Sequence, residues 1–340
     1  MKTIKAGIIG LGYWGTNLVR NFLNNPNVIM EKVCDLKKGR IEFIREKFPG
    51  IAVTSDMMDL INDKNIDAVA VATPVNTHKD IAKLCLLNNK HVFIEKPFTD
   101  NYKDGLELLN LAKETGKIIA VGHIFQFAPA VTCIKENIEK GILGDLYHLT
   151  AQRINLGPPK TTVNVLWDLG PHDLSIILYV FNEFPDKVKA FGNSYWWNGI
   201  IDNCHMFLDF PSGKTAHIHL GWLSSNKTRI INLFGEKGNI LYDETKPDND
   251  KVIFFDKGVD TRINAKDNEA TNLKYGTGEI IKLKLNKGEP LALEINAFVN
   301  SVLLNEPPIN DGKIGTEVIK ILEAATLSMK GINNEELLRS

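Results

Sequence analysis

Short apolar runs alternate with amphipathic stretches of helical length over residues 1–122. The apolar runs are rich in Val, Ile and Ala, which is typical of strands buried on both faces of a sheet. The stretches between them carry apolar residues at helical spacing, as in the stripe Leu106, Leu109 and Ala112. Because strands alternate with helices, the pattern predicts right-handed βαβ units and a parallel sheet. The predicted strands are 4–9, 28–34, 68–72, 91–94 and 118–121, and the predicted helices are 14–24, 39–47, 77–87 and 102–115.

The pattern changes after Gly122. Residues 187–256 read mostly as strands separated by turn residues such as Pro211-Ser212-Gly213, which predicts an antiparallel sheet. The polar stretch 245–272 is expected to be an edge or a loop. The remaining predicted elements are a strand at 146–155 and helices at 130–140, 168–181, 291–304 and 315–329.

These elements predict an α/β domain followed by an α+β domain. The first, 1–122, would hold a doubly wound parallel sheet, and the second, 123–340, an open and mostly antiparallel sheet. The last helices of the chain could pack back on the first domain. We expect the change of period at the boundary, rather than a flexible linker, to mark where the two domains meet.

Composition narrows the class of protein. A chain of 340 residues with 44% hydrophobic and 24% charged residues is typical of a soluble globular protein of about two domains. Lys and Arg number 40 against 41 Asp and Glu, and this balance disfavours a nucleic-acid-binding protein. The longest uncharged stretch, 118–134, is shorter than the ~20 residues of a membrane helix. The first apolar run leads into a glycine motif rather than a cleavage site, so we expect a cytoplasmic protein without membrane partners.

The first predicted strand ends in Gly10-Leu11-Gly12-Tyr13-Trp14-Gly15, a G-x-G-x-x-G motif that also opens a predicted helix. Gly10 permits a tight turn, Gly12 lets the backbone approach a pyrophosphate, and Gly15 lets the helix approach the strand. The helix N-terminus, with Tyr13 and Trp14, offers unpaired N–H groups to phosphates. The motif therefore predicts a dinucleotide cofactor.

Asp35 ends the second predicted strand, 20 residues after Gly15, where a carboxylate can accept hydrogen bonds from ribose hydroxyls. A carboxylate at this point repels a 2′-phosphate, so NAD is favoured over NADP. The basic residues Lys37, Lys38 and Arg40 lie close by and leave NADP possible.

Glu95-Lys96-Pro97 follows the predicted strand 91–94, at the edge of a parallel sheet where ligands bind. A cis Lys96–Pro97 bond would direct Lys96 into the crevice. A lysine beside the positive nicotinamide ring should have a lowered pKa and could donate or shuttle a proton. The alternative is a solvated lysine in a turn.

A second candidate site lies in Trp167-Asp168-Leu169-Gly170-Pro171-His172-Asp173. Asp168 and His172 are four residues apart, so they could share one helix face, with Pro171 in the first turn. The carboxylate favours imidazolium and a helix N-terminus disfavours it, which would leave His172 able to take a hydroxyl proton. The alternative is Asp168 as the helix N-cap and His172 as a core residue.

These motifs, together with Ala72-Thr73-Pro74 and His78, occur in an order that resembles the glucose–fructose oxidoreductase / inositol dehydrogenase / rhizopine-catabolism (Gfo/Idh/MocA) family over essentially the whole chain. The resemblance implies an N-terminal Rossmann domain that binds NAD or NADP. It also implies a homodimer or homotetramer formed through the open C-terminal sheet. The implied activity is reversible hydride transfer between the nicotinamide and a secondary alcohol of a sugar ring.

The resemblance also implies roles for individual residues. Lys96 and His172 would be catalytic, with Asp168 beside them. Polar substrate contacts would come from the segment that holds Arg153 and Asn155, and some relatives have tyrosine at the position of His172. The nicotinamide end of the cofactor site would be lined by Thr73, Pro74, His78 and Glu95, with Lys96 next to them.

The stretch from Val163 to Ser175 resembles family members that act on nucleotide-linked sugars for surface polysaccharides, with hexose C3 as the carbon oxidised. The alternatives are a free sugar or inositol dehydrogenase and a non-catalytic regulator that senses NAD(P). Retention of Lys96, Asp168 and His172 together argues against the regulator.

Other groups are ambiguous. Cys204, His205, His217 and His219 could form a metal site, but packing on a sheet face is favoured, and no metal is expected. No cysteine has metal-finger spacing, so Cys34, Cys85, Cys133 and Cys204 should be free buried thiols. One of Trp196 and Trp197 could stack on a sugar or base, with core or interface packing as the default. Arg153 and Lys160 could hold a carboxylate or diphosphate, or lie solvated on the surface.

Overall fold

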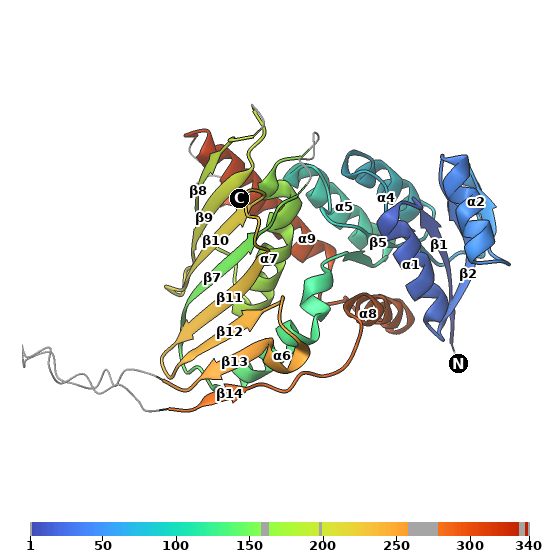
Figure 1. Cartoon of the computed structure of the whole chain (residues 1–340). Helices are drawn as coiled ribbons and strands as arrows, with labels where there is room; N and C mark the ends of the chain where they lie inside the picture. Colours follow the sequence, from blue (N-terminus) through green and yellow to red (C-terminus); the bar gives the residue numbers. More distant parts are fainter. Residues whose placement is uncertain (1, 158–162, 197–198, 258–277, 333–336, 339–340) are drawn as a thin grey trace, which may run out of the picture. The chain divides into compact units, whose positions relative to one another are not determined.

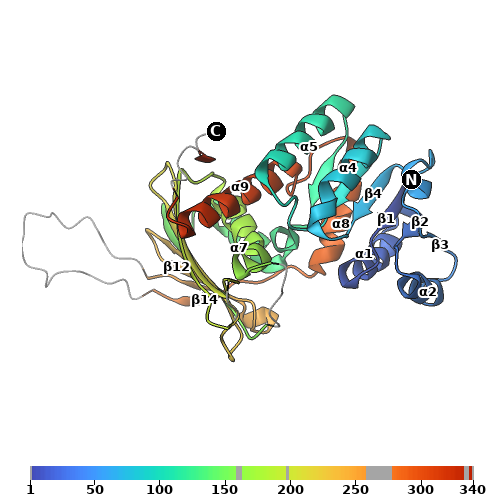
Figure 2. The ribbon, with the colours of Figure 1, turned by 90° about the horizontal axis from the view of Figure 1, so that it is seen from above.

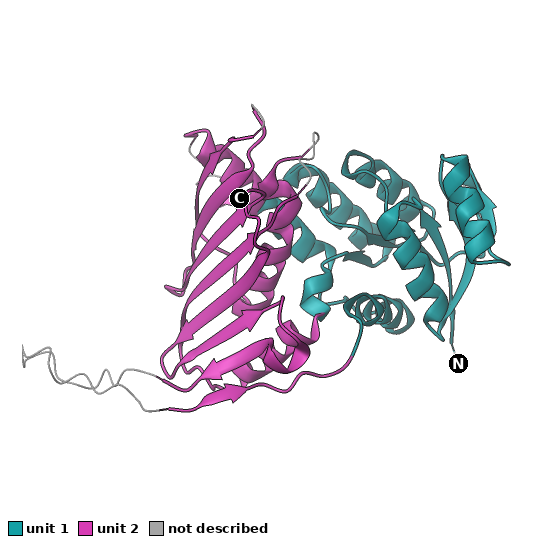
Figure 3. Ribbon diagram, viewed as in Figure 1, with its two compact units in different colours: residues 1–127, 288–320 teal, residues 128–287, 321–340 magenta. Residues whose placement is uncertain are grey.

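The computed structural model describes residues 2–157, 163–196, 199–257, 278–332 and 337–338. The chain divides into two compact units (Figure 3). Unit 1 comprises residues 1–127 and 288–320, and unit 2 comprises residues 128–287 and 321–340. Unit 1 is therefore discontinuous, because a segment from near the C-terminus completes it. The sequence predicts a domain boundary at residue 122. The two units of the structure divide at residue 127, and residues 288–320 also belong to the first unit.

Unit 1 is built on a six-stranded sheet in the order β3-β2-β1-β4-β5-β6, in which all neighbouring strands are parallel. Figure 1 labels β1, β2 and β5 of this sheet. The order reverses between β1 and β4, which is the switch point where ligands bind at the carboxyl ends of strands. The strands are β1 (Ile4–Ile9), β2 (Val28–Cys34), β3 (Ala52–Thr54), β4 (Ala68–Val71), β5 (His91–Ile94) and β6 (Ile119–Val121).

Helices cover both faces of this sheet (Figure 2). On one face, α1 and α8 pack against β1 and β5 through a core in which Phe298 contacts both Phe22 and Phe93 edge to face. The helix α8 comes from the distant segment that completes unit 1. The helices are α1 (Tyr13–Asn24), α2 (Lys38–Lys47), α3 (Met58–Ile61), α4 (His78–Leu87), α5 (Tyr102–Thr115) and α8 (Pro290–Leu304), with short helices η1 (Val75–Thr77) and η2 (Ile124–Phe127).

Unit 2 is built on an eight-stranded sheet in the order β14-β13-β12-β11-β7-β10-β9-β8. Neighbouring strands are antiparallel except for β7 and β10, which are parallel. The strands are β7 (Leu146–Ile154), β8 (Lys187–Asn193), β9 (Asn203–Asp209), β10 (Thr215–Gly221), β11 (Thr228–Gly235), β12 (Asn239–Asp243), β13 (Val252–Phe255) and β14 (Ile280–Lys282). The short helix η3 (Asp248–Asp250) precedes β13.

One face of this second sheet is covered by helices, and the other is open. The helix α7 (Val165–Phe181) packs along β10, β7 and β9, and α6 (Pro129–Glu139) packs against α7. The helix α9 (Gly312–Met329) ends on β8, where Ser328 Oγ accepts a hydrogen bond of 2.9 Å from the N–H of Ala190. Strands alternate between buried and exposed residues, and the open face displays Phe191, Phe207 and Phe234, which are 54%, 44% and 39% exposed.

The predicted fold class is confirmed: a parallel sheet with helices on both faces is followed by a mostly antiparallel sheet. The sequence pattern missed β3 and α3, which are three and four residues long. The polar stretch 245–272 contains η3 and the strand β13, and its residues from 258 lie outside the described part of the chain. Within the described residues, no helix has both the length and the apolar character needed to cross a membrane.

Candidate functional site

The glycine loop between β1 and α1 lies at the carboxyl edge of the parallel sheet. Gly10 has φ of +96°, and a Cβ at this position would press on the carbonyl group of Ala72 at the end of β4. A Cβ on Gly15 would collide with the carbonyl oxygen of Gly10. These two glycines are therefore required by close packing of the loop, the helix and the neighbouring strand.

Gly12 has a different surrounding. A Cβ at Gly12 would meet only the guanidinium of Arg40, at 3.8 Å, so the space beside this backbone is open. Gly12 caps α1 without a side-chain hydrogen bond, and no acidic residue occupies the first turn. The unpaired N–H groups of this helix end can therefore receive a negatively charged group.

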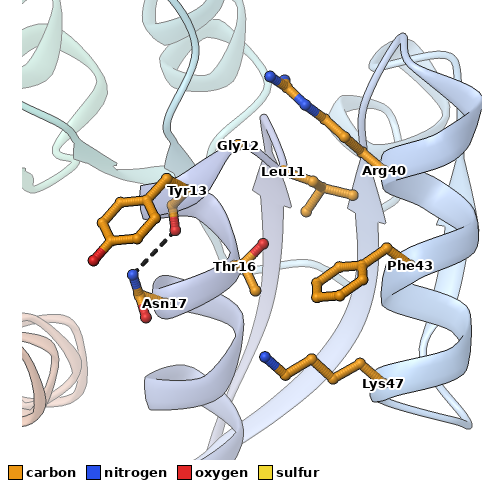
Figure 4. A pocket seen from close by; sticks show the side chains of 8 residues that line it. All are labelled: Leu11, Gly12, Tyr13, Thr16, Asn17, Arg40, Phe43 and Lys47. Carbon is orange, nitrogen blue, oxygen red and sulfur yellow. Dashed lines mark hydrogen bonds between the residues drawn. The ribbon is translucent and has the colours of Figure 1, made fainter. Parts of the chain in front are cut away.

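An open pocket of about 410 Å³ lies next to the glycine loop, between the helices α1 and α2 (Figure 4). Tyr13 lines the pocket with an exposed side chain, and Asn17 donates a hydrogen bond of 3.0 Å to the carbonyl of Tyr13. Trp14, the next residue along the helix, is also exposed. The open backbone at Gly12, the uncapped helix end and this pocket fit the pyrophosphate of a dinucleotide. The pocket is lined by Leu11, Gly12, Tyr13, Thr16, Asn17, Arg40, Phe43 and Lys47.

Asp35 is buried at the end of β2 and tied to the glycine loop. Its carboxylate accepts the N–H of Leu11 at 2.7 Å and the N–H of Lys37 at 2.8 Å, and Arg40 donates to it at 3.1 Å. Burial opposes ionisation, but these donors outweigh it and lower the pKa of Asp35. With three donors already bound, the ionised carboxylate keeps an acceptor position for a ribose hydroxyl.

His78 links the end of β4 to the Glu95-Lys96-Pro97 turn. Its Nε2 lies 2.8 Å from the carbonyl oxygen of Thr73, and its Nδ1 lies 3.0 Å from that of Pro97. The ring is 1% exposed, and burial lowers its pKa, so the imidazole braces the loops that surround the cofactor edge. Thr73 is half-buried, accepts a hydrogen bond of 2.7 Å from the hydroxyl of Thr77, and precedes the exposed Pro74.

Glu95 and Lys96 follow directly from β5. Glu95 is 9% exposed, and burial raises the pKa of its carboxyl to about 7, although the nearby Lys96 acts in the opposite direction. Its Oε2 accepts the N–H of Lys96 at 3.3 Å. Lys96 is half-buried, and the Lys96–Pro97 peptide bond is cis.

Sequence reasoning missed a second buried carboxyl group near Glu95. Glu294 lies on the buried face of α8, and Asn310 donates to its Oε1 at 3.2 Å and to the carbonyl of Val121 at 2.7 Å. A glutamate at a core position of the predicted helix 291–304 was the signal that could have found it. His123, which follows β6, is also buried, and burial lowers its pKa to about 3.

In unit 2, Asp168 and His172 lie one turn apart on α7 and are both half-buried. The helix begins earlier than predicted, at Val165, because the side chain of Asn164 caps it by accepting the N–H of Trp167 at 3.1 Å. Asp168 is therefore not the N-cap, and Pro171 lies inside the helix rather than in its first turn. Since proline has no N–H, the carbonyl of Trp167 loses its usual helical donor.

Arg153 lies on the covered face of β7 and is 3% exposed. Its guanidinium donates to Asp173 at 2.9 and 3.0 Å and to Glu244 at 3.2 Å. Burial opposes the charge, but these carboxylates raise the pKa of Arg153. The alternation Leu149, Ala151, Arg153 along the strand was a signal of this burial. Asn155, just after β7, is half-buried and donates to the carbonyl of Leu156 at 3.0 Å.

Histidines cluster on the open face of the second sheet. The ring of His205 stacks on that of His219 with centroids 4.1 Å apart, and His205 Nδ1 lies 3.2 Å from His217 Nε2. Within the described part of the chain, His, Cys, Asp and Glu side chains form no group of three or more able to hold a metal ion.

The remaining candidates divide between the described and undescribed parts of the chain. All four cysteines are free and buried, as predicted. Trp196 is 49% exposed, and its backbone N–H donates a hydrogen bond of 2.7 Å to the carboxylate of Asp202. Trp197 and Lys160 lie outside the described residues.

Comparison with known proteins gives matches along most of the chain. Residues 4–123 match a family model described as "Oxidoreductase family, NAD-binding Rossmann fold", and residues 131–241 match the GFO/IDH/MocA C-terminal domain. The myo-inositol 2-dehydrogenase of Thermotoga maritima is 25% identical over 343 residues, covering 96% of each chain. An uncharacterized oxidoreductase of Streptococcus pneumoniae is 33% identical over 257 residues, covering 71% of this chain and 68% of the relative.

Solved structures share the fold. The UDP-N-acetylglucosamine 3-dehydrogenase of Acidithiobacillus ferrooxidans superposes with a TM-score of 0.80 over 99% of this chain and 100% of that one, at 22% identity, a likeness that concerns the fold alone. The matches of both domains and the fit of the glycine loop to a dinucleotide agree. The chain belongs to the Gfo/Idh/MocA oxidoreductase family and is an NAD(P)-dependent dehydrogenase or reductase of CH–OH groups.

Proposed function

We propose that this enzyme oxidises or reduces a secondary alcohol of a sugar ring, at C3 of a nucleotide-linked hexose used in polysaccharide biosynthesis. In this proposal His172 removes the hydroxyl proton with the help of Asp168, and Lys96 binds and polarises the same oxygen. When bound, the nicotinamide accepts the hydride or gives it back. The protein's own contribution is to hold the reacting groups in position.

The observation that supports this proposal is that one chain carries two segments whose side chains have complementary roles in proton transfer. Lys96 follows the carboxyl end of β5, and Asp35 follows that of β2. The two residues therefore lie on opposite sides of the switch point between β1 and β4. The other segment places Asp168 and His172 one turn apart on α7, both half-buried. An ammonium and an imidazole with a carboxylate are the groups that proton removal from an alcohol requires.

We assign Arg153 a positioning role rather than a direct substrate contact. Its guanidinium is buried and engaged by Asp173, which is the residue next to His172 on α7. The ion pair fixes this turn of the helix to β7. Asn155, which lies beyond the end of that strand, is the better candidate for a direct polar contact with substrate.

A Lys96→Met variant tests the assignment. Hydride transfer should fall by a factor of about 10²–10⁴, because the group that stabilises the developing alkoxide is lost. Reduced nicotinamide is followed by its absorbance, with a panel of nucleotide-linked sugars and free polyols. Lys83→Met, which removes a lysine that pairs with Glu107 on the surface, is the matched control. Wild-type turnover by Lys96→Met on an identified substrate would refute the assignment.

A free inositol is the second candidate substrate, and a specific observation favours it. The relative that covers 96% of this chain is named as a myo-inositol 2-dehydrogenase. The same panel separates the two: turnover of free inositols at least tenfold better than that of nucleotide-linked sugars would decide for the inositol.

We also propose that the open face of the second sheet joins two or four copies of this chain. The exposed Phe191 and Phe207 on the neighbouring strands β8 and β9, and Phe234 on β11, support this, because exposed apolar residues favour an interaction surface. Light scattering of the purified protein tests it, and a monomer would refute it. The cytoplasmic location expected from the sequence stays a prediction.

A further inference from the structure

Two carboxyl groups are buried at the carboxyl edge of the parallel sheet. Glu95 directly follows β5 and is 9% exposed, and Glu294 on α8 is 1% exposed. Both belong to unit 1. Neither has a place in the chemistry proposed above, and a buried ionised carboxylate is costly unless it is well paired.

Glu294 is surrounded by apolar groups. Its neighbours on the buried face of α8 are Leu291, Ile295 and Phe298, which belong to the core that packs on β1 and β5. Asn310 satisfies Oε1, but Oε2 has no hydrogen-bond partner among the described residues. Burial, and after it the nearby Glu95, raises the pKa of Glu294 well above its ordinary value, which favours the protonated form.

Glu95 is the member of the pair that can change its charge near neutral pH. Its carboxyl oxygen would lie 3.0 Å from a Cβ on Gly122, so the end of β6 packs closely against it. Burial raises its pKa to about 7, and the charge of Lys96 limits the rise. His123, which follows β6 and also lies near Lys96, is buried, and burial lowers its pKa to about 3.

We propose that Glu95 and Glu294 form a proton-binding site that loses a proton when a cation occupies the space beside Lys96, so that proton release is linked to the oxidation state of the bound nicotinamide. The proposal rests on the assignment of Lys96 to the nicotinamide end of the cofactor site. Glu95 supplies the proton, which passes to solvent, and Glu294 keeps its proton because it is buried in the apolar core, although the hydrogen bond from Asn310 acts in the opposite direction.

The two oxidation states of the cofactor differ in the charge that Glu95 would experience. The oxidised nicotinamide ring is a cation and the reduced ring is neutral, while the diphosphate and the riboses are the same. A positive charge within about 4–6 Å lowers a carboxyl pKa by about 1–3 units. From a starting value of about 7, this shift at pH 7 would release about 0.4–0.5 proton per chain on binding of NAD⁺ and much less on binding of NADH.

The experiment counts protons during cofactor binding, without substrate. The full-length protein is titrated with NAD⁺ and then with NADH by calorimetry in two buffers of different ionisation enthalpy at pH 7. Wild type should release about 0.4–0.5 proton with NAD⁺. Glu95→Gln should release less than a quarter of the wild-type amount. Glu294→Gln is the matched control: an amide replaces a carboxyl that is already neutral, so release should stay within twofold of wild type.

Lys96→Met separates this inference from the proposed function. Without the ammonium, the proton on Glu95 is held more tightly, so release should persist with its maximum at a pH above that of wild type. Equal release by Glu95→Gln and wild type, or no release by Lys96→Met, would overturn the inference even if Lys96→Met has lost hydride transfer. Wild-type turnover by Lys96→Met on an identified substrate would overturn the proposed function whatever the proton count.

An infrared measurement on wild type keeps the inference testable if Glu95→Gln fails to fold. The carbonyl band of a buried protonated carboxylic acid should be present at pH 7 and should weaken when NAD⁺ binds, but not when NADH binds. Glu294→Gln should lower the band of the cofactor-free protein. Absence of the band from wild type, or a band that NAD⁺ leaves unchanged, would overturn the inference.

Discussion

Each unit has a buried cluster of ionisable side chains next to a residue proposed for catalysis, and the two clusters are built differently. In unit 2, Arg153 is held by Asp173 and Glu244, and Arg229 donates to the other oxygen of Glu244 at 2.6 Å. In unit 1, Glu95 and Glu294 are two acids in an apolar setting, and one oxygen of Glu294 has no partner among the described residues.

The difference indicates different roles. A buried ion pair whose donors and acceptors are matched keeps its charges over a wide pH range and fixes the position of the chain that carries it. Two buried acids that lack matching donors instead gain or lose protons as conditions change, because burial favours their neutral form. We therefore expect the cluster in unit 2 to position α7, and the cluster in unit 1 to respond to pH and to charge.

The largest expected effect comes from breaking the ion pair of unit 2. Arg153→Met should lower the free energy of unfolding by about 3–5 kcal/mol, because Asp173 would remain buried without its cation. Urea unfolding followed by circular dichroism measures it. The control is Arg20→Met, which removes a surface pair with Glu289 and should cost less than about 1 kcal/mol. Similar losses of unfolding free energy in the two variants would show that the buried ion pair of unit 2 contributes no more to stability than an exposed pair.

The second effect concerns the pH dependence of stability. Between the ordinary carboxyl pKa of 4.5 and about 7, the folded protein keeps a proton on Glu95 that the unfolded chain has released. This group therefore lowers wild-type stability by about 1.4 kcal/mol per pH unit as pH rises through that window. Since Glu95→Gln does not titrate, its free energy of unfolding relative to wild type should rise by about 3 kcal/mol from pH 4.5 to 7.

Other groups do not disturb that comparison. Burial lowers the pKa of His91 and of His219 to about 4, and each gives a slope of the opposite sign between that value and 6.5, but both proteins contain them. Urea unfolding at several pH values gives the difference directly. A difference that stays constant across the window would mean that Glu95 is ionised in the folded protein and that the two clusters behave alike.

The smallest effect concerns Asp35, another buried carboxyl, which resembles the cluster of unit 2 because Arg40 and two backbone N–H groups hold it. Asp35→Asn removes the charge that repels a 2′-phosphate and releases Arg40. The ratio of the dissociation constants for NADP and NAD should shift by about tenfold, or about 1.4 kcal/mol, toward NADP. Calorimetric titration measures both constants, with the exposed Asp248→Asn as control. An unchanged ratio would remove Asp35 from the basis of cofactor preference.

Local sequence signals predicted the elements that depend on local interactions. The bounds of β1, β2, β5 and α5 agree with the predicted ranges. In α5 the reasons are visible: Asn101 caps the helix by accepting the N–H of Asp104 at 2.9 Å, and Gly116 ends it with φ of +64°. The glycine motif was predicted for the same reason, since its geometry depends on residues a few positions apart.

The features that the sequence did not predict depend on contacts between distant segments. Asn310 donates a hydrogen bond to the carbonyl of Val121, 189 positions away in the chain, and no local pattern predicts that bond. The three-residue strand β3 exists because β2 offers it an edge. The start of α7 was misplaced because Asn164 and Asp168 are both good caps, and only the fold around them selects Asn164.

The discontinuity of unit 1 constrains the synthesis of the protein. While the ribosome is still adding unit 2, the apolar side chains of Phe22 and Phe93 lack Phe298, the partner that covers them in the finished molecule. The nascent N-terminal domain must wait for about 170 further residues before its core is closed. A chain that terminates early, before α8, would therefore present this uncovered face to chaperones and proteases, even though every residue of the glycine loop is in place.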